Sequence, residues 1–303
     1  MVRRSLSFLA VRSKFSNFAR LIEQNMEQQQ PILIDVERVV RAKIPGYARF
    51  IPGFVYRYLE HVIRQKELNR ILKENYERRG HEFAEGTLTS LGMKLNVVGA
   101  DRIPDTGRYI FASNHPLGGL DGIALIALLG ERYGGNVRCI VNDLLMAIEP
   151  MRSVFLPINK HGRQSRESAK AIEEAYASDC QMIMFPAGLC SRMGEGGRIA
   201  DLEWQKSFIA KSREYQRDII PIYFGGLNSK FFYKFAKLRQ RMGIKLNIEM
   251  VRLPAELVRG AGGTLNVVIG EPISYAAFDS SKTPQEWAQE VKRTVYGLAN
   301  ELK

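Results

Sequence analysis

This 303-residue chain has few cysteines, no long hydrophobic run and no serine-hydrolase motif, and each absence excludes a class of protein. Its three cysteines, at positions 139, 180 and 190, are too widely spaced for a metal-binding pattern or a disulfide framework. No hydrophobic window approaches the roughly 18 residues that a membrane-spanning helix needs. The G-x-S-x-G pattern of serine hydrolases is missing too, which removes the support for a serine thioesterase. A protein of a reducing compartment that does not span the membrane is expected.

Acidic residues are scarce relative to basic ones, since 44 Lys and Arg stand against 32 Asp and Glu, for a net charge of +12. Such a surplus favours an anionic partner: nucleic acid, a phospholipid surface or an acidic carrier protein. The first 20 residues hold five cations and no acid, with hydrophobic residues at helical spacing. A basic amphipathic helix of this kind lies in a membrane interface or packs on the protein's own core. Arg12 and Lys14 interrupt any secretory signal.

The pattern of the chain changes near residue 88. Residues 1–88 are predicted to form a basic helical region that docks on a membrane or a carrier protein, with His61 and His81 solvated. Residues 89–303 alternate strands and helices, which predicts an α/β domain with a mixed, largely parallel central sheet flanked by helices. The predicted strands are 94–98, 108–113, 136–141, 154–158, 181–185, 218–224 and 265–269. The predicted helices are 121–132, 164–178, 203–213, 229–241 and 284–301.

A histidine and an aspartate six positions apart follow the second of these strands. The strand delivers Asn114 and His115 to its carboxyl end, Gly118 and Gly119 form a turn, and Asp121 opens the next helix. Chemistry is usually placed at this edge of an α/β sheet. Histidine suits general-base catalysis because its ordinary pKa is about 6.5, and a nearby carboxylate orients the ring. Aspartate before an apolar helix is also a common N-cap, so the spacing alone leaves both roles open.

The segment QMIMFPAGLCSR (181–192) ends a strand in a tight turn and a Gly-rich loop. Turn glycines let backbone amides approach an anion, and arginine forms bidentate hydrogen bonds with phosphate or carboxylate. A surface loop with incidental arginines is the alternative. Cys190 lies here with no adjacent histidine to activate it, which argues against a nucleophilic role. Over the whole chain, the residues expected to contact substrate are Asn114, Gly118, Gly119, Lys160, Pro186, Gly188, Ser191, Arg192 and Arg198.

Two further segments end strands in the same way. Segment 155–165 turns through Lys160, His161 and Arg163, which are either a second wall of an anion pocket or exposed loop charges. Segment 218–226 reads as a buried strand in which Pro221 indicates a bulge or an edge position.

The predicted helix 229–241 carries an apolar stripe beside a cationic one. The apolar residues are Phe231, Phe235, Leu238 and Met242, and the cations one position earlier are Lys230, Lys234, Lys237 and Arg241. This arrangement suits a helix resting on an anionic membrane. Aromatic and basic residues together also stack on single-stranded nucleic acid, but no nucleic-acid module accompanies them, so no nucleic-acid partner is expected.

Taken in order, four segments over residues 90–275 resemble the blocks of the glycerophospholipid acyltransferase superfamily, of the lysophosphatidic-acid acyltransferase type. SNHPLGGLDG (113–122) resembles the first block, whose histidine and aspartate carry out acyl transfer, and FLPIN (155–159) resembles the second. FPAGLCSR (185–192) resembles the third, usually FPEGTRS, and IIPIYF (219–224) the fourth. A GEPI at 270–273 is also typical of the family.

Two departures from the family pattern stand out. Five residues separate His115 from Asp121 where the family has four, so the loop must absorb one extra residue. Ala187 stands where most members carry a glutamate that helps to hold a glycerol-phosphate acceptor. Together with the helical N-terminal extension, these departures resemble the hemolysin-like branch, which is associated with O-acylation of lyso-aminolipids such as lyso-ornithine or lyso-glycine lipid.

The resemblance implies a mechanism without metal or bound cofactor. His115 would take a proton from an acceptor hydroxyl as it attacks an acyl thioester, and Asp121 would orient the imidazole. Backbone amides at Gly118–Gly119 or Gly188 are the expected oxyanion donors. Arg192 and Arg198 would hold an anionic headgroup or the pantetheine phosphate.

The implied donor is acyl carrier protein or acyl-CoA, and the implied acceptor is a lyso-lipid at an anionic membrane surface. A cytoplasmic protein, peripheral on the inner face of the cell membrane, is therefore expected. Two alternatives remain: a lysophosphatidic acid acyltransferase of phospholipid synthesis, and a non-catalytic membrane-surface binding protein that keeps the fold.

Overall fold

The computed structural model describes residues 33–43, 45–159, 165–244 and 247–302. The predicted amphipathic helix at the N-terminus lies outside the described residues, and so do Lys160, His161 and Arg163. Within the described ranges, no helix is long and apolar enough to cross a membrane.

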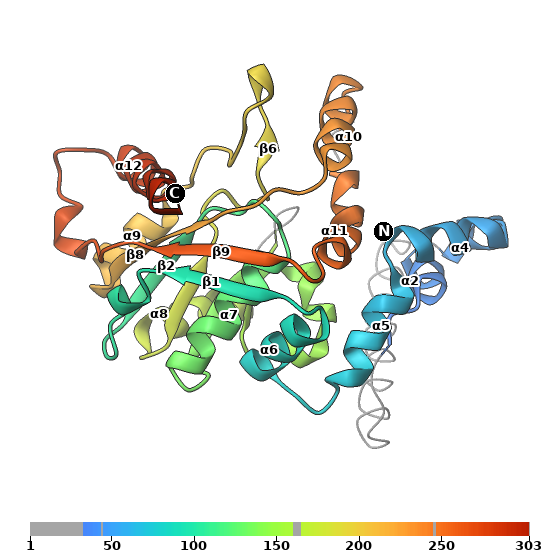
Figure 1. The fold of residues 1–303 in the computed structure, drawn as a ribbon, viewed down its shortest axis with the longest axis horizontal. Coiled ribbons are helices and arrows are strands. Elements are labelled where there is room, and N and C mark those ends of the chain that lie inside the picture. The colour runs from blue at the N-terminus through green and yellow to red at the C-terminus, as the bar shows by residue number, and fades with distance from the viewer. Residues whose placement is uncertain (1–32, 44, 160–164, 245–246, 303) are drawn as a thin grey trace, which may run out of the picture.

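A seven-stranded sheet in the order β1-β9-β8-β2-β5-β3-β4 forms the centre of the molecule (Figure 1). The strands are β1 (Lys94–Val98), β2 (Tyr109–Ser113), β3 (Val137–Asn142), β4 (Phe155–Ile158), β5 (Gln181–Met184), β8 (Asp218–Phe224) and β9 (Thr264–Ile269). Neighbouring strands run parallel except at the β8–β9 pair, so the predicted mixed, largely parallel sheet is confirmed. All seven strands coincide with predicted ones to within one or two residues at each end.

A two-stranded antiparallel hairpin, β6 (Arg192–Met193) and β7 (Ile199–Ala200), stands apart from this sheet. The sequence predicted only a Gly-rich loop here. The hairpin forms because Gly196 and Gly197, at φ values of 66° and 80°, let the chain reverse at its tip.

Helices cover both faces of the sheet (Figure 1). The strand residues alternate between the two faces, so Phe111 of β2 enters one hydrophobic cluster and its neighbours Ile110 and Ala112 enter the other. The first cluster is closed by α6 (Gly80–Ser90) and α7 (Leu120–Arg132). The second is closed by α8 (Arg166–Ala177), α9 (Ser207–Tyr215) and α12 (Pro284–Gly297). The remaining helices near the sheet are α10 (Lys230–Arg241) and α11 (Leu253–Arg259).

Helix α6 packs closely on α7. A Cβ added at Gly130 would lie 2.1 Å from the Cβ of His81, so glycine is required where the helices meet. The prediction of a solvated His81 is therefore wrong, since its side chain is only partly exposed. Phe83 and Leu88 of α6 belong to the same core as the sheet. The functional division at residue 88 stays a prediction.

The predicted helical character of the N-terminal region is confirmed for its described residues, 33–43 and 45–88. Before α6 come α2 (Val36–Lys43), α3 (Pro45–Ala48), α4 (Gly53–Val62) and α5 (Gln65–Glu74), which extend away from the sheet on one side (Figure 1).

One predicted helix begins later than expected. Helix α9 starts at Ser207 rather than at residue 203. The segment before it is irregular, and in it the fully buried indole of Trp204 donates a hydrogen bond to the carboxylate of Asp201 at 3.0 Å.

Candidate active site

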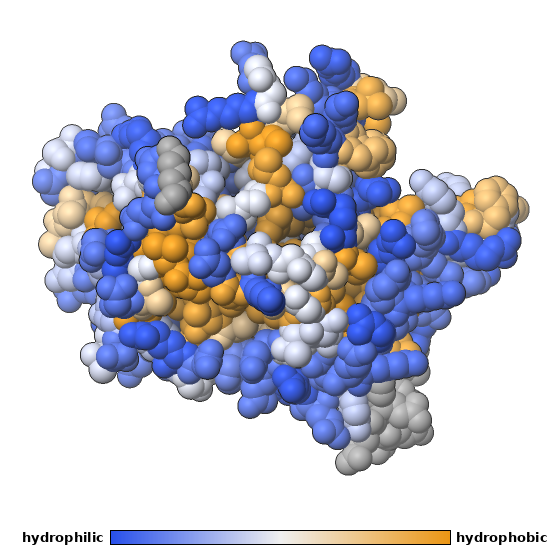
Figure 2. Space-filling model, in the orientation of Figure 1, coloured by the Kyte–Doolittle hydropathy of each residue, from blue (hydrophilic) through white to orange (hydrophobic). Residues whose placement is uncertain are grey.

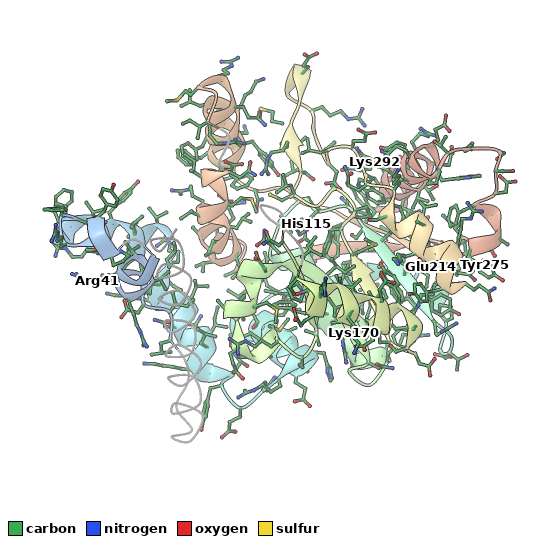
Figure 3. The ribbon with its side chains drawn as sticks, turned by 180° about the vertical axis from the view of Figure 1, so that it is seen from behind. Arg41, His115, Lys170, Glu214, Tyr275 and Lys292 are labelled. Carbon is green, nitrogen blue, oxygen red and sulfur yellow. The ribbon has the colours of Figure 1, made fainter. Side chains whose placement is uncertain are left out.

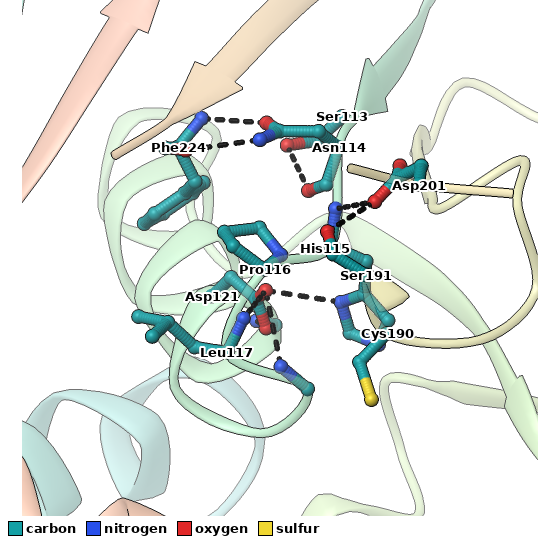
Figure 4. Close-up of polar contacts among 12 residues, drawn as sticks. Ser113, Asn114, His115, Pro116, Leu117, Asp121, Cys190, Ser191, Asp201 and Phe224 are labelled. Carbon is teal, nitrogen blue, oxygen red and sulfur yellow. Dashed lines mark hydrogen bonds and ion pairs between the residues drawn. The ribbon is translucent and has the colours of Figure 1, made fainter. Parts of the chain in front are cut away.

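The predicted His–Asp segment leaves the carboxyl end of β2, between two parallel neighbours. β5 pairs with β2 on one side and β8 on the other, so the loops after all three strands meet at one edge of the sheet. Figure 4 shows the resulting cluster around His115, to which the loop after β5 contributes Cys190 and Ser191.

The structure brings His115 and Asp121 together. Nδ1 of the imidazole lies 3.1 Å from Oδ2 of the carboxylate, although the angle at the ring nitrogen is outside that of a hydrogen bond. The histidine side chain is 16% exposed and the aspartate side chain 0%, so the imidazole reaches the surface while the carboxylate is buried. Between them the chain turns at Gly118, whose φ of 79° is one that glycine adopts without strain.

Asp121 is held by backbone amides of its own loop. Its Oδ2 accepts from the N–H of Leu117 at 3.0 Å and of Gly118 at 3.3 Å, and its Oδ1 accepts from Gly122 at 3.0 Å. It is not the N-cap, because helix α7 begins at Leu120 with Gly119 at the cap position. The carboxylate therefore bonds the loop and faces the imidazole at once.

Two contacts hold the histidine segment from the neighbouring strands. The ring of Phe185, just after β5, stacks on the imidazole with 4.1 Å between centroids and 29° between planes. The side-chain amide of Asn114 pairs with the backbone of Phe224 on β8, donating to the carbonyl at 2.9 Å and accepting from the N–H at 2.7 Å. Asn114, predicted to bind substrate, thus has both amide atoms engaged in extending the pairing of β2 with β8.

Asp201 is a component of this site that sequence reasoning missed. Its Oδ1 accepts from the backbone N–H of His115 at 3.2 Å and from the hydroxyl of Ser191 at 2.6 Å (Figure 4). The backbone carbonyl of His115 in turn accepts from the N–H of Ser191 at 2.8 Å. The residue follows β7 and lies outside every predicted block, and an Asp-Leu-Glu-Trp run carries no motif that would have revealed it.

Asp201 also joins the C-terminal helix to the site. Its backbone N–H donates to the hydroxyl of Tyr296 at 2.7 Å, and its carbonyl accepts from the ammonium of Lys292 at 2.8 Å. Both partners lie on α12, which Figure 3 marks at Lys292. Burial lowers the pKa of Lys292. Burial also raises the pKa of Tyr296, and the negative charge of Asp201 adds to this effect.

Arg192 is engaged in a buried ion pair. Its Nη2 lies 2.9 Å from Oε1 of Glu249, and the Nε of Arg239 lies 2.9 Å from the other carboxylate oxygen. The three side chains are at most 6% exposed. The guanidinium predicted to hold an anionic headgroup therefore ties the loop after β5 to helix α10, which contributes Arg239.

The other predicted substrate contacts are dispersed. Arg198 is exposed on the hairpin, and Pro186 is buried, with its carbonyl accepting from Gln205. The amides expected to stabilise an oxyanion have partners inside the protein: Gly119 donates to Leu117, Gly188 to Phe185, and Gly118 to Asp121.

The thiol of Cys190 is fully buried. Burial raises its pKa, and the Arg192 guanidinium 2.9 Å away only partly opposes the effect. A thiol in this state is a poor nucleophile. Among the described residues, no group of three or more His, Cys, Asp and Glu side chains is placed to hold a metal ion.

Comparison with known proteins gives a consistent result. Residues 38–303 match a family model described as acyltransferase. The chain is 45% identical over 273 residues to the lyso-glycine lipid O-acyltransferases of Phocaeicola vulgatus and Bacteroides thetaiotaomicron, covering 90% of this chain and 98% and 100% of those proteins. The 1-acyl-sn-glycerophosphate acyltransferase PlsC of Thermotoga maritima aligns over 88% of this chain and 94% of its own, at 19% identity and a TM-score of 0.46.

Proposed function

Because the chain belongs to the acyltransferase family, we propose that it transfers a fatty acyl group from a thioester to the hydroxyl of a lyso-aminolipid, with lyso-glycine lipid as the first candidate. The observation that carries the choice of acceptor is the 45% identity, over 90% of the chain, to two enzymes of that name. Ala187, in place of the glutamate that the resemblance associates with glycerol-phosphate acceptors, supports the same choice.

In this proposal His115 is the general base. Its Nδ1 faces Asp121, which leaves Nε2 to take the proton of the acceptor hydroxyl. The hydroxyl oxygen attacks the thioester carbonyl, and the tetrahedral intermediate then expels the thiolate, which recovers the proton from Nε2. Acceptor ester and free thiol are the products, and no acyl-enzyme forms.

Asp121 would hold the ring and stabilise its charged form. The carboxylate is buried and fixed by three backbone amides, so little reorganisation is needed when the imidazolium forms. The off-angle approach of the two groups can tighten into a hydrogen bond when substrate binds, as is common in catalytic pairs.

The donor in this proposal is acyl carrier protein or acyl-CoA, and the reaction takes place at an anionic membrane on its cytoplasmic side. Helix α10 and its C-cap residue support the proposed membrane location, because they expose hydrophobic side chains. Phe231, Leu238 and Met242 are 54%, 54% and 65% exposed. Lys230 and Lys234 are exposed on the same helix, which suits anionic headgroups.

The test is release of thiol from acyl carrier protein thioester by the purified protein in the presence of lyso-glycine lipid. His115→Ala should lower the rate by about three orders of magnitude with the unfolding temperature unchanged. Lyso-ornithine lipid and lysophosphatidic acid serve as competing acceptors, and acyl-CoA as the competing donor. Wild-type turnover by His115→Ala would refute the mechanism.

The acceptor has its own criterion. A clear preference for lysophosphatidic acid would refute the aminolipid assignment. Lipid mass spectrometry of a deletion strain should show accumulation of a monoacyl glycine lipid. Binding to vesicles without thiol release from any donor would favour the non-catalytic alternative.

A further inference from the structure

Arg252 is a half-buried cation that the structure leaves without a polar partner. It is the last residue of a short 3₁₀ helix, η5 (Ile248–Arg252), and directly precedes α11. Among the described residues, its Nε is buried and has no hydrogen-bond partner. A buried polar atom of this kind is rare in a folded protein, and arginine cannot relieve it by losing a proton. The guanidinium therefore calls for a partner from outside the described chain.

The two carboxylates at helical spacing from Arg252 are both engaged elsewhere. Glu249, three residues earlier, lies between two other arginines, each with a nitrogen 2.9 Å from one of its oxygens. Glu256, four residues later, accepts at 2.8 Å from the Nε of Arg259 and at 2.8 Å from a backbone N–H at the N-cap of α10. In the described part of the chain, then, neither of these carboxylates pairs with Arg252.

An aromatic ring holds the guanidinium of Arg252 in place. Its Cζ lies 4.6 Å from the centroid of the Phe231 ring, on helix α10. Figure 2 shows hydrophobic residues on α10 beside hydrophilic ones. A ring against the face of a guanidinium leaves the N–H groups in its plane free to bind a planar anion. Arg252 is thus oriented by an apolar contact that does not neutralise its charge.

Helix α11 packs against the loop of the candidate active site, residues 115–121. A Cβ added at Gly118 of this loop would lie 2.8 Å from Cδ2 of Leu253. Helices α10 and α11 stand together on one side of the molecule (Figure 1). Because Arg252 directly precedes Leu253 and its guanidinium contacts Phe231, it lies where this loop meets the helix proposed to contact the bilayer. The headgroup of a lipid substrate has to pass this junction.

We propose that Arg252 binds the carboxylate of the acceptor headgroup. A glycine attached to a lipid through its nitrogen keeps its carboxylate, and a guanidinium forms two parallel hydrogen bonds with such a group. Arg192, which the sequence predicted for this role, is engaged in a buried ion pair, whereas Arg252 is not. The inference rests on the proposed function, since it concerns the acceptor of that reaction.

The first test compares two acceptors that differ in headgroup charge, lyso-glycine lipid and its glycinamide analogue. Arg252→Gln should raise the KM for lyso-glycine lipid about ten- to hundredfold, because a charge-assisted bidentate contact is lost, and should leave kcat within about threefold. The same substitution should change the KM for the glycinamide analogue by no more than about twofold. Arg252→Lys, which keeps the charge without the planar fork, should recover part of the affinity.

Two further variants separate this contact from a general loss of charge or of packing. Arg213→Gln removes an exposed arginine of α9 and should leave both KM values within about twofold of the wild type. Phe231→Leu keeps an apolar side chain on α10 but removes the ring, and should raise the KM for lyso-glycine lipid about two- to fivefold. The unfolding temperature of Arg252→Gln should equal that of the wild type, because no ion pair within the described residues is broken.

A binding measurement makes the test independent of acyl transfer. N-decanoylglycine should bind the His115→Ala protein in a calorimetric titration, and adding Arg252→Gln should lower the affinity about tenfold or more. N-decanoylglycinamide, which has no carboxylate, should bind both proteins equally weakly.

Three results would overturn the proposal: an unchanged affinity for N-decanoylglycine in Arg252→Gln, an equal loss for the glycine and glycinamide compounds, or a raised KM for the acyl carrier thioester alone. The last would place Arg252 at the donor. If no lyso-lipid caused thiol release while N-decanoylglycine still bound in a manner that depends on Arg252, the proposed function would fail and this inference would stand.

Discussion

The carboxylate of Asp201 accepts a hydrogen bond from the backbone N–H of His115, so a residue 86 positions later in the chain holds the main chain at His115. The same oxygen accepts the hydroxyl of Ser191, and the other oxygen accepts the indole of Trp204. Asp201 is in this sense a positioning residue, which acts on the imidazole through the main chain.

Asp201→Ala should therefore lower kcat by about a hundredfold with little change in KM, because a displacement of about 1 Å in a catalytic group costs that much. Trp204→Phe is the matched control, since it removes one bond to Asp201 and leaves the bond to His115. If activity in Asp201→Ala fell only in proportion to the folded fraction, measured by circular dichroism, the positioning role would be wrong.

The variant Arg192→Met distinguishes a structural role of Arg192 from a role in binding the acceptor. Glu249 loses one of its two cationic partners in Arg192→Met, and breaking a buried ion pair typically costs about 3–5 kcal/mol of unfolding free energy. We expect a lower urea midpoint, with the acceptor KM of the remaining folded protein little changed.

The control is Arg198→Gln on the exposed hairpin, which should leave the free energy of unfolding within about 0.5 kcal/mol of the wild type.

The structural role of Arg192 would be contradicted if Arg192→Met raised the KM for the acceptor and left stability unchanged. That result would support headgroup binding by Arg192, as the sequence predicted.

Cys190 provides a test of direct transfer. Because its thiol is buried and its pKa is raised, Cys190→Ala should keep acyl transfer within about threefold of the wild type. The wild-type protein, quenched during turnover, should carry no acyl group by mass spectrometry. A thioester on residue 190, together with an inactive Cys190→Ala variant, would show a covalent route.

The pKa of Glu256 predicts how the stability of the fold changes at low pH. Burial alone would raise the pKa of this carboxyl, but bonds from Ser229 and Arg259 outweigh burial and lower it. A group with a depressed pKa in the folded state stabilises the fold above its unfolded pKa, and this contribution is lost as pH falls through the folded value.

Glu256→Gln should thus be less stable than the wild type by about 1–2 kcal/mol at pH 7, and the difference should shrink as pH falls below about 4. Urea unfolding at both pH values measures it. A difference that did not depend on pH would show that the charge of Glu256 contributes nothing.

The sheet was predictable because its strands are short, apolar and flanked by turn residues. The burial of β2 on both faces is visible in Tyr-Ile-Phe-Ala-Ser, which contains no charged residue. The start of α9 was not predictable, because it depends on Trp204 reaching Asp201, a contact that has no periodicity. The hairpin β6–β7 was missed since two-residue strands leave no pattern to read.

The contacts of the site between residues near in sequence were predictable, whereas those between residues far apart in sequence were not. His115 and Asp121 are six positions apart, so their approach at the start of α7 needs no contact between distant parts of the chain. Arg192 was expected to hold an anionic headgroup. Its partner Glu249 is 57 residues away, and the sequence gives no sign of such a pairing. Asp201 was missed for the same reason.

The segment from His115 to Asp121 is a local unit, because His115 follows β2 directly and Asp121 lies in the first turn of the next helix, α7. No movement of one half of the molecule against the other is needed to form the pair. The loop after β5 contacts this segment through Phe185 and Ser191 without supplying either member of the pair. In the proposed mechanism, residues of that loop that contact the acceptor could change while the pair of His115 and Asp121 stays in place.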